Sequence, residues 1–118
     1  MAGGLSIHVV DVSRGVVAAG MRVEVYAATP SRTLLCAGEI NTKGVLDDPV
    51  LMSDAIVAGY YEAVFHAAAY YRLAGAPLPD QPFLDVVTYR FGISDVAQHY
   101  HLPMKFTPWG YSCFRGGA

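Results

Sequence analysis

The sequence predicts an all-β protein with one short helix, folded as a two-sheet β-sandwich. Many short stretches alternate apolar and polar residues at a period of two, which is typical of strands with one buried face. Clusters rich in Gly, Pro, Asn and Asp separate these stretches and are typical of turns. Only residues 67–74 are rich enough in alanine to favour a helix. Short strands with frequent turns and so little helix favour a sandwich.

Length and composition are consistent with a single domain that spans residues 1–118. Apolar residues make up 53% of the chain and charged residues only 15%. This fraction of apolar residues is high for a small monomeric protein. We therefore expect other copies of the chain to cover part of its surface. The net charge of -2 gives no strong field that would recruit nucleic acid or an anionic membrane.

The first residues lack the basic region and apolar run of a signal peptide, which favours a cytoplasmic protein. The longest apolar region, residues 55–78, is interrupted by charged residues, Gly and Pro, so we expect no membrane span. The two cysteines, Cys36 and Cys113, form no close metal-binding motif. A disulfide between them stays open from the sequence alone.

The first half of the chain predicts three strands. They span residues 5–12, 21–28 and 34–40. The first is rich in β-branched residues and ends at Ser13-Arg14-Gly15, and the third ends at Asn41-Thr42-Lys43-Gly44, which suits a tight reversal. Residues 45–51 are predicted to be irregular with a short edge strand, because Pro49 cannot serve in a central strand.

The second half predicts four strands and the helix. The strands span residues 60–66, 83–91, 99–107 and 111–115. The helix over residues 67–74 is ended by Gly75 and Pro77. His66 lies between the first of these strands and the helix, and we expect a structural role for it.

The strand over residues 99–107 carries the most chemistry. Its alternation places His99 and His101 on one face, and Tyr100 and Leu102 on the other. The apolar row is expected to face the core, so both imidazoles point away from it. Two neutral bases on a stiff strand, with Arg115 a short turn later, favour a reaction centre over a solvated surface.

Five motifs in order along nearly the whole chain resemble the 5-hydroxyisourate hydrolase family, which is related to transthyretin. They are Ser6-Ile7-His8-Val9-Val10-Asp11, Asn41-Thr42-Lys43-Gly44, Gly59-Tyr60-Tyr61, His99-Tyr100-His101-Leu102-Pro103 and Tyr111-Ser112-Cys113-Phe114-Arg115-Gly116-Gly117. The resemblance implies a transthyretin-like sandwich in a homotetramer, a dimer of dimers with active sites at the dimer–dimer interface. It also implies that water opens the ring of a urate oxidation product, with no metal or organic cofactor.

The resemblance assigns roles to residues at both ends of the chain. The family's N-terminal His corresponds to His8 and its strand histidines to His99 and His101, while the family ending Tyr-Arg-Gly-Ser corresponds to residues 114–117. His8 and His101 are expected to flank the water, one as the base and the other orienting or protonating. Arg115 is expected to face the substrate's carbonyls or the oxyanion. His99 is expected to contact substrate or support the site.

The chain departs from the family at three positions, which are Val45 in place of Arg, Phe114 in place of Tyr and Gly117 in place of Ser. Each change removes a polar contact from the substrate site. Methylated ring nitrogens cannot ionise, and they make the ring larger and less polar. We therefore expect an N-methylated (trimethyl) 5-hydroxyisourate, a product of methylxanthine (caffeine-type) catabolism, to be preferred to the unmethylated compound.

Other interpretations of the same residues stay open. The three departures are also compatible with a non-catalytic transthyretin-like module that binds a small molecule. A hydrolase of another cyclic amide or imide is a third possibility. A metal site built from His8, His99 and His101 is disfavoured, because no acidic residue or Cys lies at ligand spacing beside them.

Overall fold

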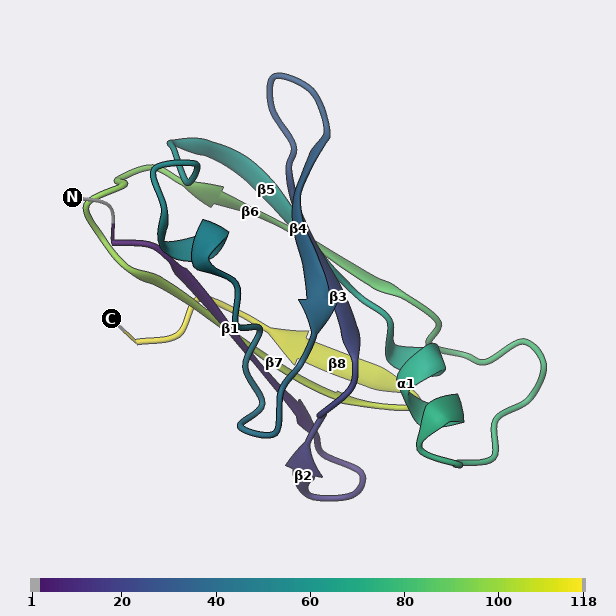
Figure 1. Ribbon diagram of the computed structural model, residues 1–118. Coiled ribbons are helices and arrows are strands. Elements are labelled where there is room, and N and C mark those ends of the chain that lie inside the picture. Colours follow the sequence, from purple (N-terminus) through teal and green to yellow (C-terminus); the bar gives the residue numbers. More distant parts are fainter. Residues whose placement is uncertain (1–2, 118) are drawn as a thin grey trace.

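The structure, a computed structural model, describes residues 3–117 as two four-stranded sheets with one α-helix at one end (Figure 1). The elements are β1 (Leu5–Asp11), β2 (Val16–Val17), β3 (Arg22–Ala27), β4 (Thr33–Glu39), the 3-10 helix η1 (Pro49–Met52), β5 (Gly59–Phe65), α1 (Ala67–Leu73), β6 (Val87–Ile93), β7 (Tyr100–Thr107) and β8 (Gly110–Cys113). The predicted two-sheet β-sandwich with one short helix is confirmed.

One sheet has the strand order β2-β1-β7-β8 and the other has β4-β3-β5-β6. All neighbours are antiparallel except β1 and β7, which run parallel from Leu5 beside Tyr100 to Asp11 beside Phe106. This parallel pair brings the two ends of the chain to the same region of the molecule (Figure 1). Strands β6 and β8 each form one edge of their sheet.

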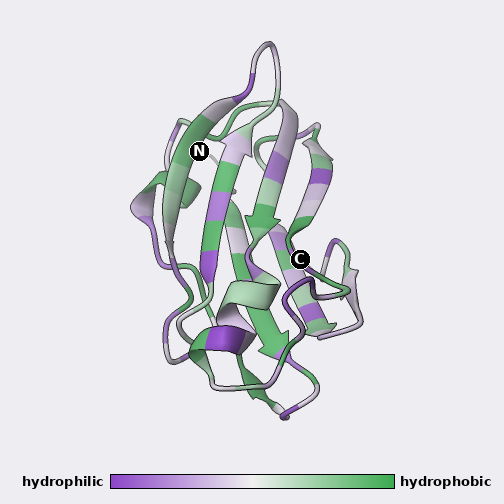
Figure 2. Cartoon of the chain, turned by 90° about the vertical axis from the view of Figure 1, so that its right-hand side faces the viewer, coloured by the Kyte–Doolittle hydropathy of each residue, from purple (hydrophilic) through white to green (hydrophobic). Residues whose placement is uncertain are grey.

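The core lies between the sheets and is filled by every second residue of the strands. Apolar and polar residues form alternating bands along the strands (Figure 2). In β1 the buried apolar side chains are Leu5, Ile7 and Val9, and in β7 they include Met104 and Phe106. Full burial of one such side chain contributes about 1.5–3 kcal/mol. The alternation therefore fixes which face of β1 and β7 is turned outward.

A buried carboxylate joins β1 to α1 at the helix end of the sandwich. Asp11 is 0% exposed. It accepts hydrogen bonds from Ser13 and Tyr71 at 2.7 Å, from Arg14 Nε at 2.9 Å and from Tyr70 at 3.0 Å. Burial alone would raise the pKa of Asp11, but these hydrogen bonds together lower it below its ordinary value. The ionised carboxylate therefore stabilises the contact between strand and helix.

The prediction of a strand over residues 83–91 was wrong at its start, because β6 begins at Val87. The Phe83 side chain is 84% exposed. The carbonyl of Asp85 accepts a hydrogen bond from the Ala68 backbone N–H at 2.9 Å. The stretch before β6 is therefore bonded to the first turn of α1 and not to a neighbouring strand. The predicted last strand likewise ends at Cys113 and not at Arg115. The two-residue strand β2 was not predicted, being too short to show alternation.

The predicted short edge strand within residues 45–51 is not formed. The backbone makes one isolated bridge, between Val45 and His8, and then enters η1. The Asp48 carboxylate accepts the Val50 backbone N–H at 2.9 Å, and Pro49 occupies the first helical turn, where it needs no N–H donor.

Three smaller predictions can also be compared with the structure. Cys36 and Cys113 are both free thiols, so the possible disulfide is not formed. His66 lies 3.3 Å from the Glu24 carboxylate, which agrees with a structural role. In the part of the chain described, no helix is both long and apolar enough to cross a bilayer.

Candidate active site

The parallel pairing of β1 and β7 places predicted site residues from both ends of the chain on one face. In the register of the pair, Ser6 lies beside His101 and His8 lies beside Pro103. The flanking residues Ile7 and Leu102 are buried, whereas Ser6, His8 and His101 are half-buried on the outward face. The structure therefore brings His8 and His101 to neighbouring positions on the same surface.

A serine links two of the imidazoles. The Ser6 hydroxyl oxygen lies 2.8 Å from His99 Nε2 and 2.7 Å from His101 Nδ1. His99 Nδ1 lies 2.7 Å from the backbone carbonyl of Gly3. Sequence reasoning missed Ser6, although the alternation of the first strand already placed it on the same face as His8. What the sequence could not show is the register that sets this hydroxyl between the two rings.

The surroundings of His101 disfavour its charged form. Burial of the ring lowers its pKa below the ordinary value, and the charges that His8 and His99 carry when protonated lower it further. The neutral imidazole is therefore favoured over the charged form. Only the neutral form has a lone pair that can accept a proton.

His8 is fixed from one side by the turn after β4. The Val9 N–H donates to the Gly44 carbonyl at 2.9 Å, and Val45 forms its backbone bridge with His8. Gly44 has a φ of +85°, and a Cβ at this position would lie 2.7 Å from His8 Nε2. The turn therefore requires glycine both for its backbone and for the space that the imidazole fills. Val45 lies beside His8 as an uncharged neighbour.

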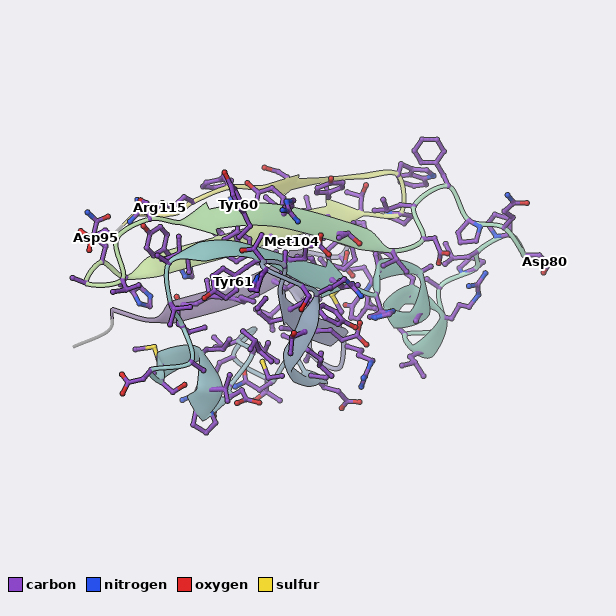
Figure 3. All side chains as sticks on the ribbon, turned by 90° about the horizontal axis from the view of Figure 1, so that it is seen from above. Tyr60, Tyr61, Asp80, Asp95, Met104 and Arg115 are labelled. Carbon is purple, nitrogen blue, oxygen red and sulfur yellow. The ribbon has the colours of Figure 1, made fainter. Side chains whose placement is uncertain are left out.

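Arg115 is not part of the imidazole row. Its Nη2 donates to Gln98 Oε1 at 2.9 Å, and its guanidinium lies 4.0 Å from the centroid of the Tyr100 ring. The side chain lies at the same end of the sandwich as Asp95 and far from Asp80, which lies beyond α1 (Figure 3). Arg115 borders a small pocket of about 60 Å³, but that pocket is lined mainly by core-facing residues such as Leu5 and Leu102 and lies behind the outward-facing imidazoles.

The C-terminal tail places only one of its residues against an imidazole. Phe114 is 44% exposed, and a Cβ at Gly117 would meet nothing within 4 Å. Gly116, which sequence reasoning did not single out, donates its N–H to the His101 carbonyl at 2.7 Å. A Cβ there would lie 2.8 Å from His101 Cδ2. Within one chain, Phe114 is therefore partly exposed, and the Cβ position of Gly117 has no close neighbour.

The three histidines do not converge as a metal-ligand set. Across residues 3–117 no group of three or more His, Cys, Asp or Glu side chains lies close enough to hold a metal ion. The Ser6 hydroxyl occupies the space between His99 and His101.

Comparison with known proteins assigns the chain to a family. A model of the HIUase/Transthyretin family matches residues 5–116. The chain belongs to the HIUase/Transthyretin family. Among family members it is 43% identical over 116 residues to the 5-hydroxyisourate hydrolase of Deinococcus radiodurans, covering 96% of this chain and 95% of the relative. It is 41% identical over 115 residues to 5-hydroxyisourate hydrolase 2 of Rhizobium meliloti, covering 97% and 96%.

Solved structures share the fold. The 5-hydroxyisourate hydrolase of Klebsiella pneumoniae superposes with a TM-score of 0.79 at 27% identity, covering 99% of this chain and 100% of the other. An (S)-allantoin synthase superposes with a TM-score of 0.91 at 33% identity. That match covers 98% of this chain but 44% of the longer synthase chain. The names of the relatives agree with the hydrolase predicted from the motifs.

Proposed function

We propose that the chain is a hydrolase that opens the ring of 5-hydroxyisourate, with a preference for an N-methylated derivative. The observation that carries this proposal is the placement of His8 and His101 on the same outward face of the β1–β7 pair, at neighbouring positions of its register. The lowered pKa of His101 supports it, because that imidazole stays ready to take a proton at neutral pH. Relatives that match nearly the whole chain carry the hydrolase name.

The reaction consumes one water molecule, and the proton that the imidazole takes up is released again within the same reaction. An imidazole of the His8–His101 pair accepts a proton from water as the water oxygen bonds to a ring carbonyl carbon. The C–N bond then breaks, and the imidazolium gives the proton to the departing nitrogen. A positioned general base contributes about 10²–10⁴-fold to such a rate. We assign to Arg115, whose side chain is hydrogen-bonded to Gln98 just before β7, the role of stabilising the charge that develops on the carbonyl oxygen.

A complete substrate site requires more than one copy of the chain. The pocket that Arg115 borders measures about 60 Å³ and lies on the core side of β7, whereas pockets for small molecules measure about 300–1,000 Å³. The imidazoles face outward, where a second subunit can close the site. The edge strands β6 and β8 have backbone groups free to pair with another copy. We therefore propose a homotetramer, a dimer of dimers, with the sites where the dimers meet.

The preference for a methylated ring follows from the residues that replace charged or polar family residues. Val45 lies beside His8 and offers an apolar contact where the family has a guanidinium. Burial of one methyl group contributes about 0.8 kcal/mol, and leaving a buried polar group without a partner costs about 1–3 kcal/mol. A trimethylated ring therefore suits Val45, Phe114 and Gly117 better than a ring that ionises.

The test is the absorbance decay of freshly generated 5-hydroxyisourate and of its trimethyl analogue, each corrected for spontaneous decay. We expect a higher kcat/KM for the trimethyl compound, and we expect Val45→Arg to shift the ratio toward the unmethylated ring. Equal or faster turnover of the unmethylated compound by the wild-type chain would reject the methyl preference. Absence of any acceleration would reject the hydrolase and favour a small-molecule binding module.

A further inference from the structure

The hydrogen-bond chain through Ser6 has a direction that the donors and acceptors determine. It begins at the backbone carbonyl of Gly3, which can only accept a hydrogen bond. His99 Nδ1, 2.7 Å away, must therefore carry a proton and donate it. In the neutral ring the other nitrogen, Nε2, is then a bare acceptor.

Ser6 determines which atom is the donor in its hydrogen bond with His101. Its hydroxyl has a single proton, which must point to His99 Nε2 at 2.8 Å, because that nitrogen has none to give. The contact of 2.7 Å between Ser6 Oγ and His101 Nδ1 then has the nitrogen as donor. His101 thus carries its proton on Nδ1, and its Nε2 holds a lone pair.

We propose that Ser6 and His99 are positioning residues that hold His101 in the Nδ1–H tautomer, so that His101 Nε2 is the atom that accepts the proton from water. The part played by Nε2 rests on the proposed hydrolase function. For a neutral His99 ring, the tautomer follows from the hydrogen bonds alone.

The environment of the His101 ring supports this assignment. Among residues 3–117, no hydrogen bond to His101 Nε2 is formed, so its lone pair is available. The Gly116 N–H donates to the His101 carbonyl, and a Cβ at Gly116 would lie 2.8 Å from Cδ2, the carbon beside Nε2, so there is no room for a side chain on this side of the ring. His8, in contrast, has no side-chain hydrogen bond within the described residues that would select one tautomer. Of the two imidazoles, His101 is therefore the one prepared as a base.

The tautomer can be measured directly by ¹⁵N NMR of the imidazole nitrogens in the full-length protein. We expect Nδ1 of His101 to carry the proton in the wild type. In Ser6→Ala the Nδ1–H loses its acceptor, and we expect the Nε2–H form to become populated. Ser6→Thr keeps the hydroxyl and should restore the wild-type tautomer. Ser31→Ala, in the exposed turn between β3 and β4, is the matched control and should change nothing.

Kinetics give the second readout. Because Ser6 acts through His101, we expect Ser6→Ala to lower kcat about 10-fold while leaving KM nearly unchanged, which is the change that loss of one hydrogen bond produces. In His99→Ala the Ser6 hydroxyl is free to donate to His101 Nδ1, which would again move the His101 proton to Nε2. Both variants should therefore show the same change of tautomer.

The outcomes separate this proposal from the proposed function. A His101 protonated on Nε2 in the wild type would overturn the positioning role, whatever the activity. A change of tautomer in Ser6→Ala with kcat unaltered would overturn the assignment of Nε2 as the proton acceptor. A wild-type chain with the expected tautomer but without turnover would reject the hydrolase, and with it the role of Nε2, while the positioning by Ser6 would stand.

Discussion

Substitution of Gly116 by alanine tests whether the C-terminal tail holds the His101 ring in place. The new Cβ would lie 2.8 Å from His101 Cδ2 and 3.2 Å from Pro103 Cδ. Carbon atoms in contact normally lie about 3.5–4.0 Å apart, so the ring or the tail must move by several tenths of an ångström. The ring resists this movement because Ser6 holds its Nδ1.

The expected cost follows from that conflict. Overpacking of this kind costs about 1–3 kcal/mol, divided between lost stability and displaced groups. A displacement of about 1 Å in a catalytic group can lower a rate 10²-fold. We therefore expect kcat/KM of Gly116→Ala to fall by roughly 10- to 100-fold. The assay is the decay of freshly generated substrate, with far-UV circular dichroism to show that the fold is kept.

Gly110→Ala is the matched control for this experiment. Neither glycine has a positive φ, so alanine is compatible with both backbones. A Cβ at Gly110 would meet nothing within 4 Å, so we expect kcat/KM to stay at the wild-type value. Wild-type activity in Gly116→Ala would show that the tail does not lie against His101, and the described packing of the site would be refuted.

Three further predictions concern stability, pH and redox state. Asp11→Asn should lower the free energy of unfolding at pH 7 by about 1–3 kcal/mol in urea titrations. Because the folded pKa of Asp11 lies below its unfolded value of about 3.9, the wild-type contribution is present above that pH and is lost as the pH falls through the folded pKa. If Asp11→Asn lowered the free energy of unfolding as much at a pH below the folded pKa of Asp11 as at pH 7, this account would be contradicted. The wild-type pH–rate profile should rise through a pKa below the ordinary value of about 6.5, because burial and neighbouring imidazoles lower the pKa of His101. A midpoint above that value would argue against His101 as the base. Added reductant should leave Tm unchanged, because Cys36 and Cys113 are free thiols, and a lower Tm would reveal a disulfide.

Period-two alternation was sufficient to predict the sandwich and the outward position of the imidazoles. Ile7 and Leu102 had to be buried, and their neighbours His8 and His101 therefore had to face away from the core. This reasoning needs only local information, because the sequence of one strand determines its two faces.

The hydrogen-bond chain could not be predicted in the same way. Ser6 and His99 are 93 positions apart in the sequence, and their contact depends on the parallel register of β1 and β7. A shift of one residue in that register would move Ser6 away from the space between the two rings. The start of β6 was missed for a similar reason, because the carbonyl of Asp85 bonds to the backbone of α1 and not to a neighbouring strand.

The most direct test of the proposed hydrolase is the decay of freshly generated trimethyl 5-hydroxyisourate with the wild-type chain and with His101→Gln. We expect the wild type to accelerate the decay well above its spontaneous rate, and the variant to lose about 10²–10⁴-fold in kcat. Full activity in His101→Gln would contradict the assignment of this imidazole as the base.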